Sequence, residues 1–201
     1  GAGGIPSIKA LREGLAANRI NWLAGIINGT TNFIRSEMDS KGREFADVLT
    51  EAQDKGYAEA DPTFDVEGID AAHKLVIMAS LAFAMPLNLD GIFTDGITKL
   101  EPQDVGYARE LGYAIKHLGI TRQTEHGVEL RVHPTLVPES CRIAGVTDVS
   151  TAVRVNADAV GTTLYSGAGA GSERPASSVF VDVFAVARTT VSEADPWCAS
   201  W

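Results

Sequence analysis

Cysteine is scarce in this sequence, whose 201 residues include only Cys141 and Cys198, far apart along the chain. Two such cysteines cannot build the dense disulfide framework of a small secreted domain, and they lack the CxxC spacing of a structural zinc site. The four histidines share no metal-ligand spacing such as HExxH. We therefore expect a cytoplasmic protein that has neither a disulfide framework nor a zinc site.

Positive charge is also in short supply, because 17 lysines and arginines stand against 26 aspartates and glutamates, for a formal net charge of -9. Binding to nucleic acid depends on clustered lysine and arginine side chains, and this composition argues against it. The longest apolar run, residues 75–85, is too short to cross a bilayer. We expect neither nucleic acid nor a membrane as a partner.

The composition that remains, 45% hydrophobic and 21% charged, is that of a globular protein with a sizeable core. Apolar periodicity and turn residues predict helices over residues 6–17, from the turn at 28–31 to about 38, and over 45–55, 69–84, 103–118 and 179–188. They predict strands over residues 21–27, 122–125, 128–132, 153–156 and 162–165.

Helices and hairpin-like strand pairs are partly segregated along the chain, which favours an α+β fold. We expect two layers, with a mixed β-sheet and helices packed on one of its faces. The open face of the sheet is then available for dimerisation.

Two charged residues, Asp70 and Lys74, interrupt the otherwise almost wholly apolar helix predicted over residues 69–84. Residues four apart lie on one face of a helix. From Leu75 onward this helix is apolar on nearly every side, as in a buried element. Burying an ammonium and a carboxylate is costly unless they are paired or meet a ligand, so the pair is a candidate site. The alternative is an ordinary surface ion pair.

Three more carboxylates, Glu59, Asp61 and Asp65, precede this helix and make residues 56–74 the segment where we expect chemistry. Asp61 stands directly before a proline, and we interpret it as a turn residue in a solvated loop. Glu59 and Asp65 are candidates for substrate binding, with the solvated loop as the alternative.

A glycine-rich segment, residues 167–171, lies between a predicted strand and a predicted helix. Such an arrangement can cradle a phosphate, but the spacing is not the GxGxxG of a dinucleotide fingerprint. Contact with a cofactor and a tight turn that needs positive φ are both open interpretations.

Three stretches together carry a family resemblance: GIINGTTNFI at residues 25–34, GYAEADPTFDVEGIDAAHKL at residues 56–75, and GAGAG at residues 167–171. The chain resembles the catalytic domain of homoserine dehydrogenase over residues 3–188. The resemblance implies a homodimeric oxidoreductase that uses NAD or NADP to interconvert L-homoserine and L-aspartate 4-semialdehyde, in the biosynthesis of threonine, methionine and isoleucine.

The resemblance also implies roles for three side chains. Lys74 matches the lysine that exchanges a proton with the substrate oxygen, and Glu59 and Asp70 match carboxylates that hold homoserine. From its position near the helix start, we expect Asp65 to support them. A lysine partly withdrawn from water can serve as general acid and base. Glu59 can accept hydrogen bonds from the α-ammonium of the substrate, while Asp70 fixes the position of the lysine.

Further positions follow from the family pattern alone. Gly29, Thr30 and Tyr57 match residues that line the substrate pocket, and Gly171 matches a glycine that contacts NAD or NADP. The backbone carbonyls of Gly3 and Ile5 match a stretch that can hold a monovalent cation such as sodium, for which carbonyl oxygens are suitable ligands.

By the same resemblance, residues 1–5 end a link from a nucleotide-binding domain that we expect to be missing, and residues 6–165 form the catalytic domain. Residues 166–190 form the glycine loop and a return helix, and residues 191–201 a tail unlike the family. Without the missing domain the hydride donor cannot be positioned, so we expect no turnover by the chain alone. Two alternatives stay open: a free-standing amino-acid-binding or dimerisation module, and a sister NAD(P)-dependent amino-acid dehydrogenase.

Overall fold

A computed structural model describes residues 4–169 and 173–194 of the chain. Its helical elements are α1 (Ser7–Lys9), the π-helix η1 (Ala10–Gly14), α2 (Gly29–Lys41), α3 (Phe45–Asp54), α4 (Thr63–Val66), α5 (Ile69–Phe83), α6 (Pro102–Glu110), the 3-10 helix η2 (Arg142–Gly145) and α7 (Glu173–Ala194). Its strands are β1 (Ile20–Ile26), β2 (Phe93–Thr94), β3 (Tyr113–Thr124), β4 (Gly127–Pro138), β5 (Ser150–Ala157) and β6 (Gly161–Ala168).

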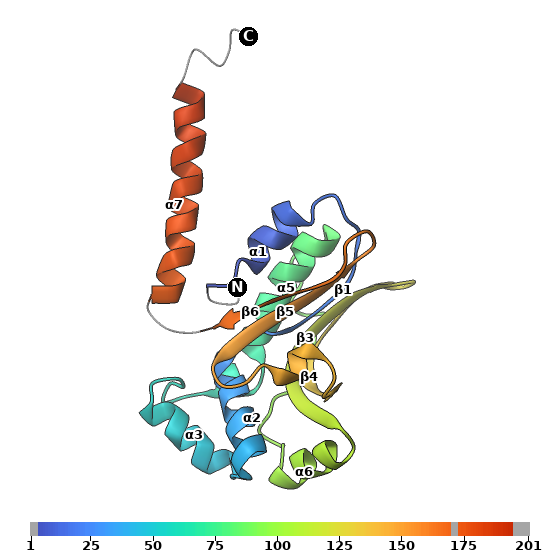
Figure 1. Cartoon of the computed structure of the whole chain (residues 1–201), viewed down its shortest axis with the longest axis vertical. Helices are drawn as coiled ribbons and strands as arrows, with labels where there is room; N and C mark the ends of the chain where they lie inside the picture. Colours follow the sequence, from blue (N-terminus) through green and yellow to red (C-terminus); the bar gives the residue numbers. More distant parts are fainter. Residues whose placement is uncertain (1–3, 170–172, 195–201) are drawn as a thin grey trace.

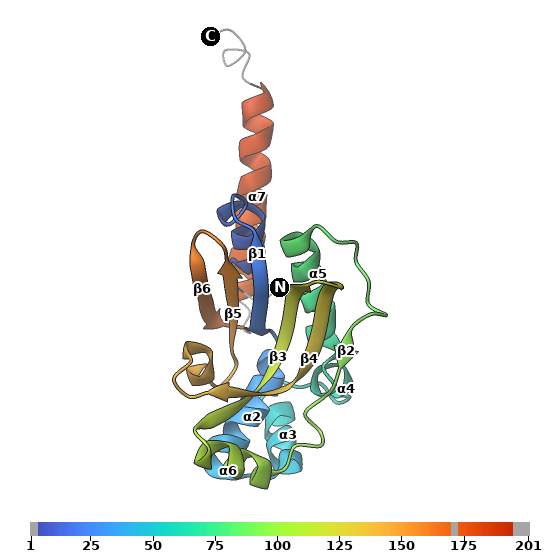
Figure 2. The ribbon, with the colours of Figure 1, turned by 90° about the vertical axis from the view of Figure 1, so that its right-hand side faces the viewer.

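The strands form one sheet in the order β2-β4-β3-β1-β5-β6, with β2 at one edge and β6 at the other (Figure 2). All neighbouring strands are antiparallel except β2 and β4, which run parallel, so the sheet is mixed as predicted. At its centre Gly25 of β1 pairs with Gly119 of β3 and with Val153 of β5.

The main core lies between α5 and one face of the sheet, where Leu75, Val76 and Met78 are buried against residues of β1, β4 and β5. A Cβ on Gly119 would lie 2.8 Å from Cδ1 of Ile27, so a larger residue there would require the Ile27 side chain to shift. The sequence predicted a helix that is buried on nearly every side. That prediction was wrong for the outer face, where large apolar side chains of α5 stay exposed, because no second layer covers it in the described structure.

The helices α2, α3 and α6 gather at one end of the sheet, whereas α1 and α5 lie along one of its faces (Figure 1). At that end of the sheet, Phe33, Ile34 and Met38 of α2 form a second core cluster with Val48 and Ala52 of α3. This cluster fixes α2, whose first turn begins directly after β1, and so places the loop at residues 27–28 next to α5.

The second face of the sheet carries no long helix in the described residues, as predicted, but η2 covers part of it. Ile143 and Ala144 pack there on Leu118 and Val137. The remainder of this face keeps apolar side chains that are only partly buried, among them Trp22.

Several predicted helix ranges were wrong, among them the one expected over residues 179–188. The helix expected over residues 103–118 ends at Glu110, because Gly112 has φ +79° and the chain turns into β3 at Tyr113. The helix expected over residues 6–17 ends at Gly14 and is mainly a π-helix. The return helix α7 spans Glu173–Ala194 and projects from the sheet and its helices (Figure 1). No helix among residues 4–169 and 173–194 has the length and apolarity needed to cross a membrane.

Candidate active site

The predicted pair on α5 forms an ion pair. Nζ of Lys74 lies 2.6 Å from Oδ2 of Asp70 and also donates to the main-chain oxygen of Ile27, at 3.2 Å. The side chains of Lys74 and Asp70 keep 28% and 20% of their surface exposed. They are therefore shielded enough to interact more strongly than a surface pair, yet open to a small ligand. Two fixed acceptors hold the ammonium at the end of β1.

The sequence did not predict the residue that connects these groups, Asn28, which is 5% exposed. Its Oδ1 accepts the N–H of Thr31 at 2.8 Å and so caps α2. Its Nδ2 donates to Oδ1 of Asp65 at 2.6 Å and to Oδ2 of Asp70 at 2.8 Å. The sequence predicted only a turn at residues 28–31. The signal was the choice of asparagine, because its amide has two further hydrogens that need acceptors.

The site carries an excess of negative charge. Burial raises the pKa of Asp65, and the nearby carboxylates of Asp70 and Glu59 raise it further, whereas the hydrogen bond from Asn28 and the charge of Lys74 oppose the shift. Glu59 is exposed and reaches this cluster through its electrostatic field. Three carboxylates around one ammonium can attract a second, incoming ammonium group.

The residues matched to the substrate pocket adjoin this cluster. Gly29 and Thr30 directly follow Asn28, and Oγ1 of Thr30 donates to the main-chain oxygen of Tyr57 at 2.7 Å. The ring of Tyr57 is partly exposed and packs edge-on against Phe33. These contacts keep the loop before α4 close to the first turn of α2.

Asp61 takes the turn role that the sequence predicted. Its Oδ1 accepts the N–H of Thr63 at 3.1 Å, and the residue is exposed. Hydrogen bonds from the Thr63 side chain and, to a lesser extent, from its main-chain N–H lower the pKa of Asp61. These local bonds therefore explain Asp61 without a ligand.

The positions matched to the cofactor and to a cation are only partly visible. Gly171 and Gly3 lie outside the described residues. Ile5 is buried at a cavity of about 520 Å³ lined by residues 4–6, 164–168 and 177, and its main-chain oxygen accepts the N–H of Ser7 at 2.8 Å. Within the described ranges, no group of three or more His, Cys, Asp and Glu side chains is placed to hold a metal ion.

Of the two described glycines that precede Gly171, Gly169 is needed for space rather than for a turn, whereas a Cβ on Gly167 would make only ordinary contacts. Neither Gly167 nor Gly169 is among the described glycines with positive φ, so the tight-turn interpretation does not apply to them. A Cβ on Gly169 would lie 2.3 Å from Cγ2 of Thr151, a distance that no side chain tolerates. The segment thus runs close against β5 before it reaches Gly171.

An α+β domain with a lysine held among carboxylates at the end of a strand is suited to proton transfer on a small molecule that carries an amine. The sequence profile of homoserine dehydrogenase matches residues 6–184. A homoserine dehydrogenase of Pseudomonas aeruginosa is 67% identical over 192 residues, which cover 96% of this chain and 44% of that protein. One of Neisseria gonorrhoeae is 64% identical over 93% of this chain and 43% of its own length.

The fold agrees with these relatives. The crystal structure of a homoserine dehydrogenase from Thiobacillus denitrificans superimposes with a TM-score of 0.93 and 63% identity, over 95% of this chain and 44% of that one. The chain belongs to the homoserine dehydrogenase family. It spans less than half the length of these relatives.

Proposed function

We propose that this chain is the substrate-binding and catalytic part of an NAD- or NADP-dependent homoserine dehydrogenase, which interconverts L-homoserine and L-aspartate 4-semialdehyde. The observation that carries the proposal is the pairing of Lys74 with Asp70, held by Asn28, within the stretch that matches the family. Membership of the family supports the reaction.

In the oxidising direction, the substrate hydroxyl gives its proton to Nζ of Lys74 and its carbon gives up a hydride, which leaves an aldehyde. In the reducing direction Lys74 returns the proton to the aldehyde oxygen. Lys74 must lose its proton before it can accept one, and the carbonyl of Ile27 and the carboxylate of Asp70 keep the amine in place meanwhile. Glu59 and Asp65 bind the α-ammonium of the substrate by charge-assisted hydrogen bonds.

The dinucleotide supplies or accepts the hydride when it is bound. The described residues fit a limited share of its binding, because the described lining of the cavity beside Gly167 holds one tyrosine, two serines and otherwise small or apolar residues. The nearby basic side chains, Lys9 and Arg12, line an adjoining cavity instead. We propose that this segment leads Gly171 to the dinucleotide and leaves the phosphates to another part of the enzyme. The main-chain oxygens of Ile5 and Gly3 would be the ligands of the monovalent cation. Of these two residues, the structure describes Ile5, which lies at the same cavity.

The test uses a protein that joins this chain to a nucleotide-binding domain. We expect NAD(P)H formation with homoserine and none with aspartate. Glu59→Gln should raise KM for homoserine about tenfold or more and change kcat less, because the lost charge acts on binding. Glu125→Gln, at the exposed turn between β3 and β4, is the matched control and should change neither. Equal activity on both amino acids would contradict the proposal in favour of a sister dehydrogenase.

The alternative of a free-standing binding module predicts a different result. In that case the isolated chain binds homoserine in calorimetry, and joining it to a nucleotide-binding domain produces no turnover. A cytoplasmic location, expected from the sequence, stays a prediction.

A further inference from the structure

Two cationic side chains are completely buried between α2 and β3, outside the candidate active site. Arg35 is 1% exposed and Lys116 is 0% exposed. One carboxylate serves them: Asp39 lies 3.4 Å from Nη1 of Arg35, and it also binds Arg109 of α6. The two buried cations and the exposed Arg109 therefore depend on one carboxylate, which is unfavourable if Arg35 and Lys116 are both charged.

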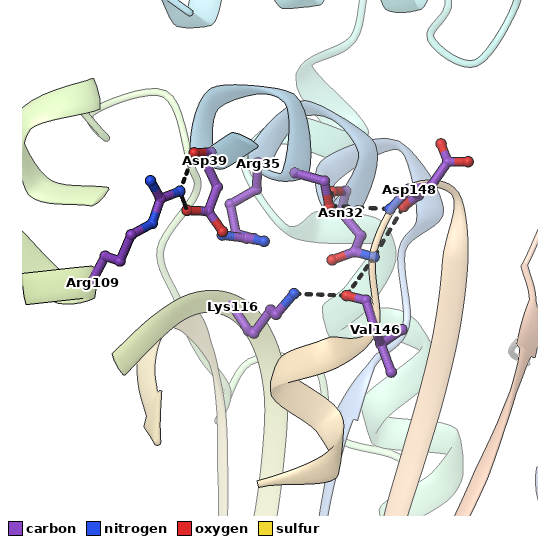
Figure 3. A network of polar contacts seen from close by, with 8 residues as sticks. Asn32, Arg35, Asp39, Arg109, Lys116, Val146 and Asp148 are labelled. Atoms are coloured by element: carbon purple, nitrogen blue, oxygen red, sulfur yellow. Dashed lines mark hydrogen bonds and ion pairs between the residues drawn. The ribbon is translucent and has the colours of Figure 1, made fainter. Parts of the chain in front are cut away.

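The hydrogen bonds of Arg35 are incomplete as well. Its Nε and Nη2 are buried and have no acceptor among the described residues. Figure 3 shows the guanidinium of Arg35 and the amine of Lys116 facing the same space. A protonated Lys116 has three N–H donors and nothing to offer Arg35, whereas a neutral amine has a lone pair that can accept.

Lys116 helps to hold the 146–150 loop, the segment that runs from η2 into the first residue of β5. Its Nζ donates to the main-chain oxygen of Val146 at 2.6 Å. Nδ2 of Asn32 donates to the oxygens of Val146 and Asp148, at 3.4 and 2.9 Å (Figure 3), and to the oxygen of Ser150 at 3.0 Å. Asp148 adopts φ +60°, which is costly for a residue other than glycine, so the loop needs these bonds.

This loop lies between two parts of the proposed active site. The oxygen of Val149 accepts the N–H of Gly169, at 3.1 Å, just before the segment that carries Gly171. The same oxygen would lie 3.0 Å from a Cβ on Gly29, at the turn that starts α2. A shift of the loop would therefore move both the substrate turn and the cofactor segment.

We infer that Lys116 is a positioning residue that works as a neutral amine: it donates to Val146 while its lone pair faces Arg35, and protonation puts a second charge beside Arg35 that drives the amine away and loosens the 146–150 loop. The inference rests on the proposed function only in that the loop adjoins the proposed site. Burial, and to a lesser extent the charge of Arg35, lower the pKa of Lys116 to about 7, while Asp39 opposes the shift. Arg109 acts through Asp39, and the carboxylate of Asp148 points away from the amine (Figure 3).

The first test is an NMR titration of the full chain with 13C-labelled lysine side chains. We expect one lysine to titrate at a pH of about 7. That signal should disappear in Lys116→Met and persist in Lys99→Met, whose lysine is exposed on the surface. If every lysine titrates in the ordinary range of about 10, the inference is overturned. This readout needs no enzyme activity, so it fails independently of the proposed function.

The second test measures the loop through the hydrogen-exchange protection of the Gly169 amide. Protection in the unmodified chain should fall about fivefold or more between pH 8 and pH 6, beyond the intrinsic change in exchange rate. Lys116→Met should show no such fall, and Lys116→Arg, which cannot become neutral, should show low protection at both pH values. Protection in the unmodified chain that is independent of pH would overturn the role of Lys116 in holding the loop, whether or not the variants fold.

Discussion

The amide of Asn28 gives the candidate site its geometry. The Asn28 side chain caps α2 with its oxygen and donates to Asp65 and Asp70 with its nitrogen. It therefore links the start of α2 to the start of α5. Asp70 in turn binds Lys74. The position of the ammonium therefore depends on a residue that takes no part in proton transfer.

The substitution Asn28→Asp tests this connection. The new carboxylate can still cap α2, but it loses two donors and faces two other carboxylates in a buried place. We expect a loss of about 2–4 kcal/mol in the free energy of unfolding at pH 8, and a smaller loss at pH 5, where protonation relieves the repulsion. Urea denaturation at the two pH values measures it.

Asn88 provides the control for this experiment, because its side-chain oxygen also accepts a main-chain N–H, from Asp90, but in an exposed loop. Asn88→Asp should change stability by no more than about 0.5 kcal/mol. Equal effects at both positions would show that the amide of Asn28 does not organise the site.

The sequence pattern identified the charged pair on α5 as a candidate site, because two charged residues in an otherwise apolar helix are unusual. The sequence pattern could not predict that Arg35 and Lys116 are buried, because the residues next to each are compatible with an exposed side chain. Only the packing of α2 on β3 buries them. Long-range packing of this kind leaves no signal in a single sequence.

At the scale of elements, the start of α5 is set by Gly68, which has φ +81° and precedes the first helical turn. A Cβ at this position would lie 3.0 Å from Cε1 of His117 and 3.1 Å from Cγ1 of Val132. Both neighbours are buried in the sheet and cannot easily give way. The position of Asp70 thus depends on a glycine that is needed for its conformation and for its small size.

We predict that Gly68→Ala lowers the free energy of unfolding by about 1–3 kcal/mol, because it combines a strained φ with a steric clash. Gly106, in the interior of α6, has no atom within 4 Å of its added Cβ. Gly106→Ala should therefore stabilise the chain by about 0.5–1 kcal/mol. Thermal or urea denaturation compares the two, and a neutral or stabilising Gly68→Ala would disprove the role assigned to Gly68.

The ends of the helices and strands show where tertiary contacts override the local sequence preference. The sequence predicted the helix of α5 and the hairpin of β3 and β4, whose turn residues are explicit. It extended the helix of α6 through residues 113–118, which are apolar enough for either structure. Pairing of Tyr113 with Pro138 and of Leu118 with His133 makes this segment a strand instead.

At the scale of the whole molecule, the face of the sheet opposite α5 is the surface that we propose for dimerisation. Register places Trp22, Ala24, Ile120 and Arg154 on this face, and Arg154 stacks over the ring of Trp22. Ala24 and Ile120 stay only partly buried. A second copy of the chain can cover these apolar side chains by a symmetric contact.

We predict that Ile120→Asp converts a dimer into a monomer, because it places a charge in the middle of that contact. Leu111→Asp changes a largely exposed leucine after α6 and should leave the dimer intact. Sedimentation velocity distinguishes the two states, with circular dichroism as the check on folding. A monomeric unmodified chain, or a dimeric Ile120→Asp variant, would refute this interface.

The central claim is that Lys74 carries the proton in a homoserine dehydrogenase reaction, and turnover of a Lys74→Met variant tests it most directly. The measurement needs the chain joined to a nucleotide-binding domain, with Lys99→Met as the control. We predict that kcat for homoserine falls by about 10²–10⁴ in Lys74→Met and stays unchanged in Lys99→Met, at equal folding stability. A Lys74→Met enzyme that folds and turns over at the unmodified rate would contradict the claim.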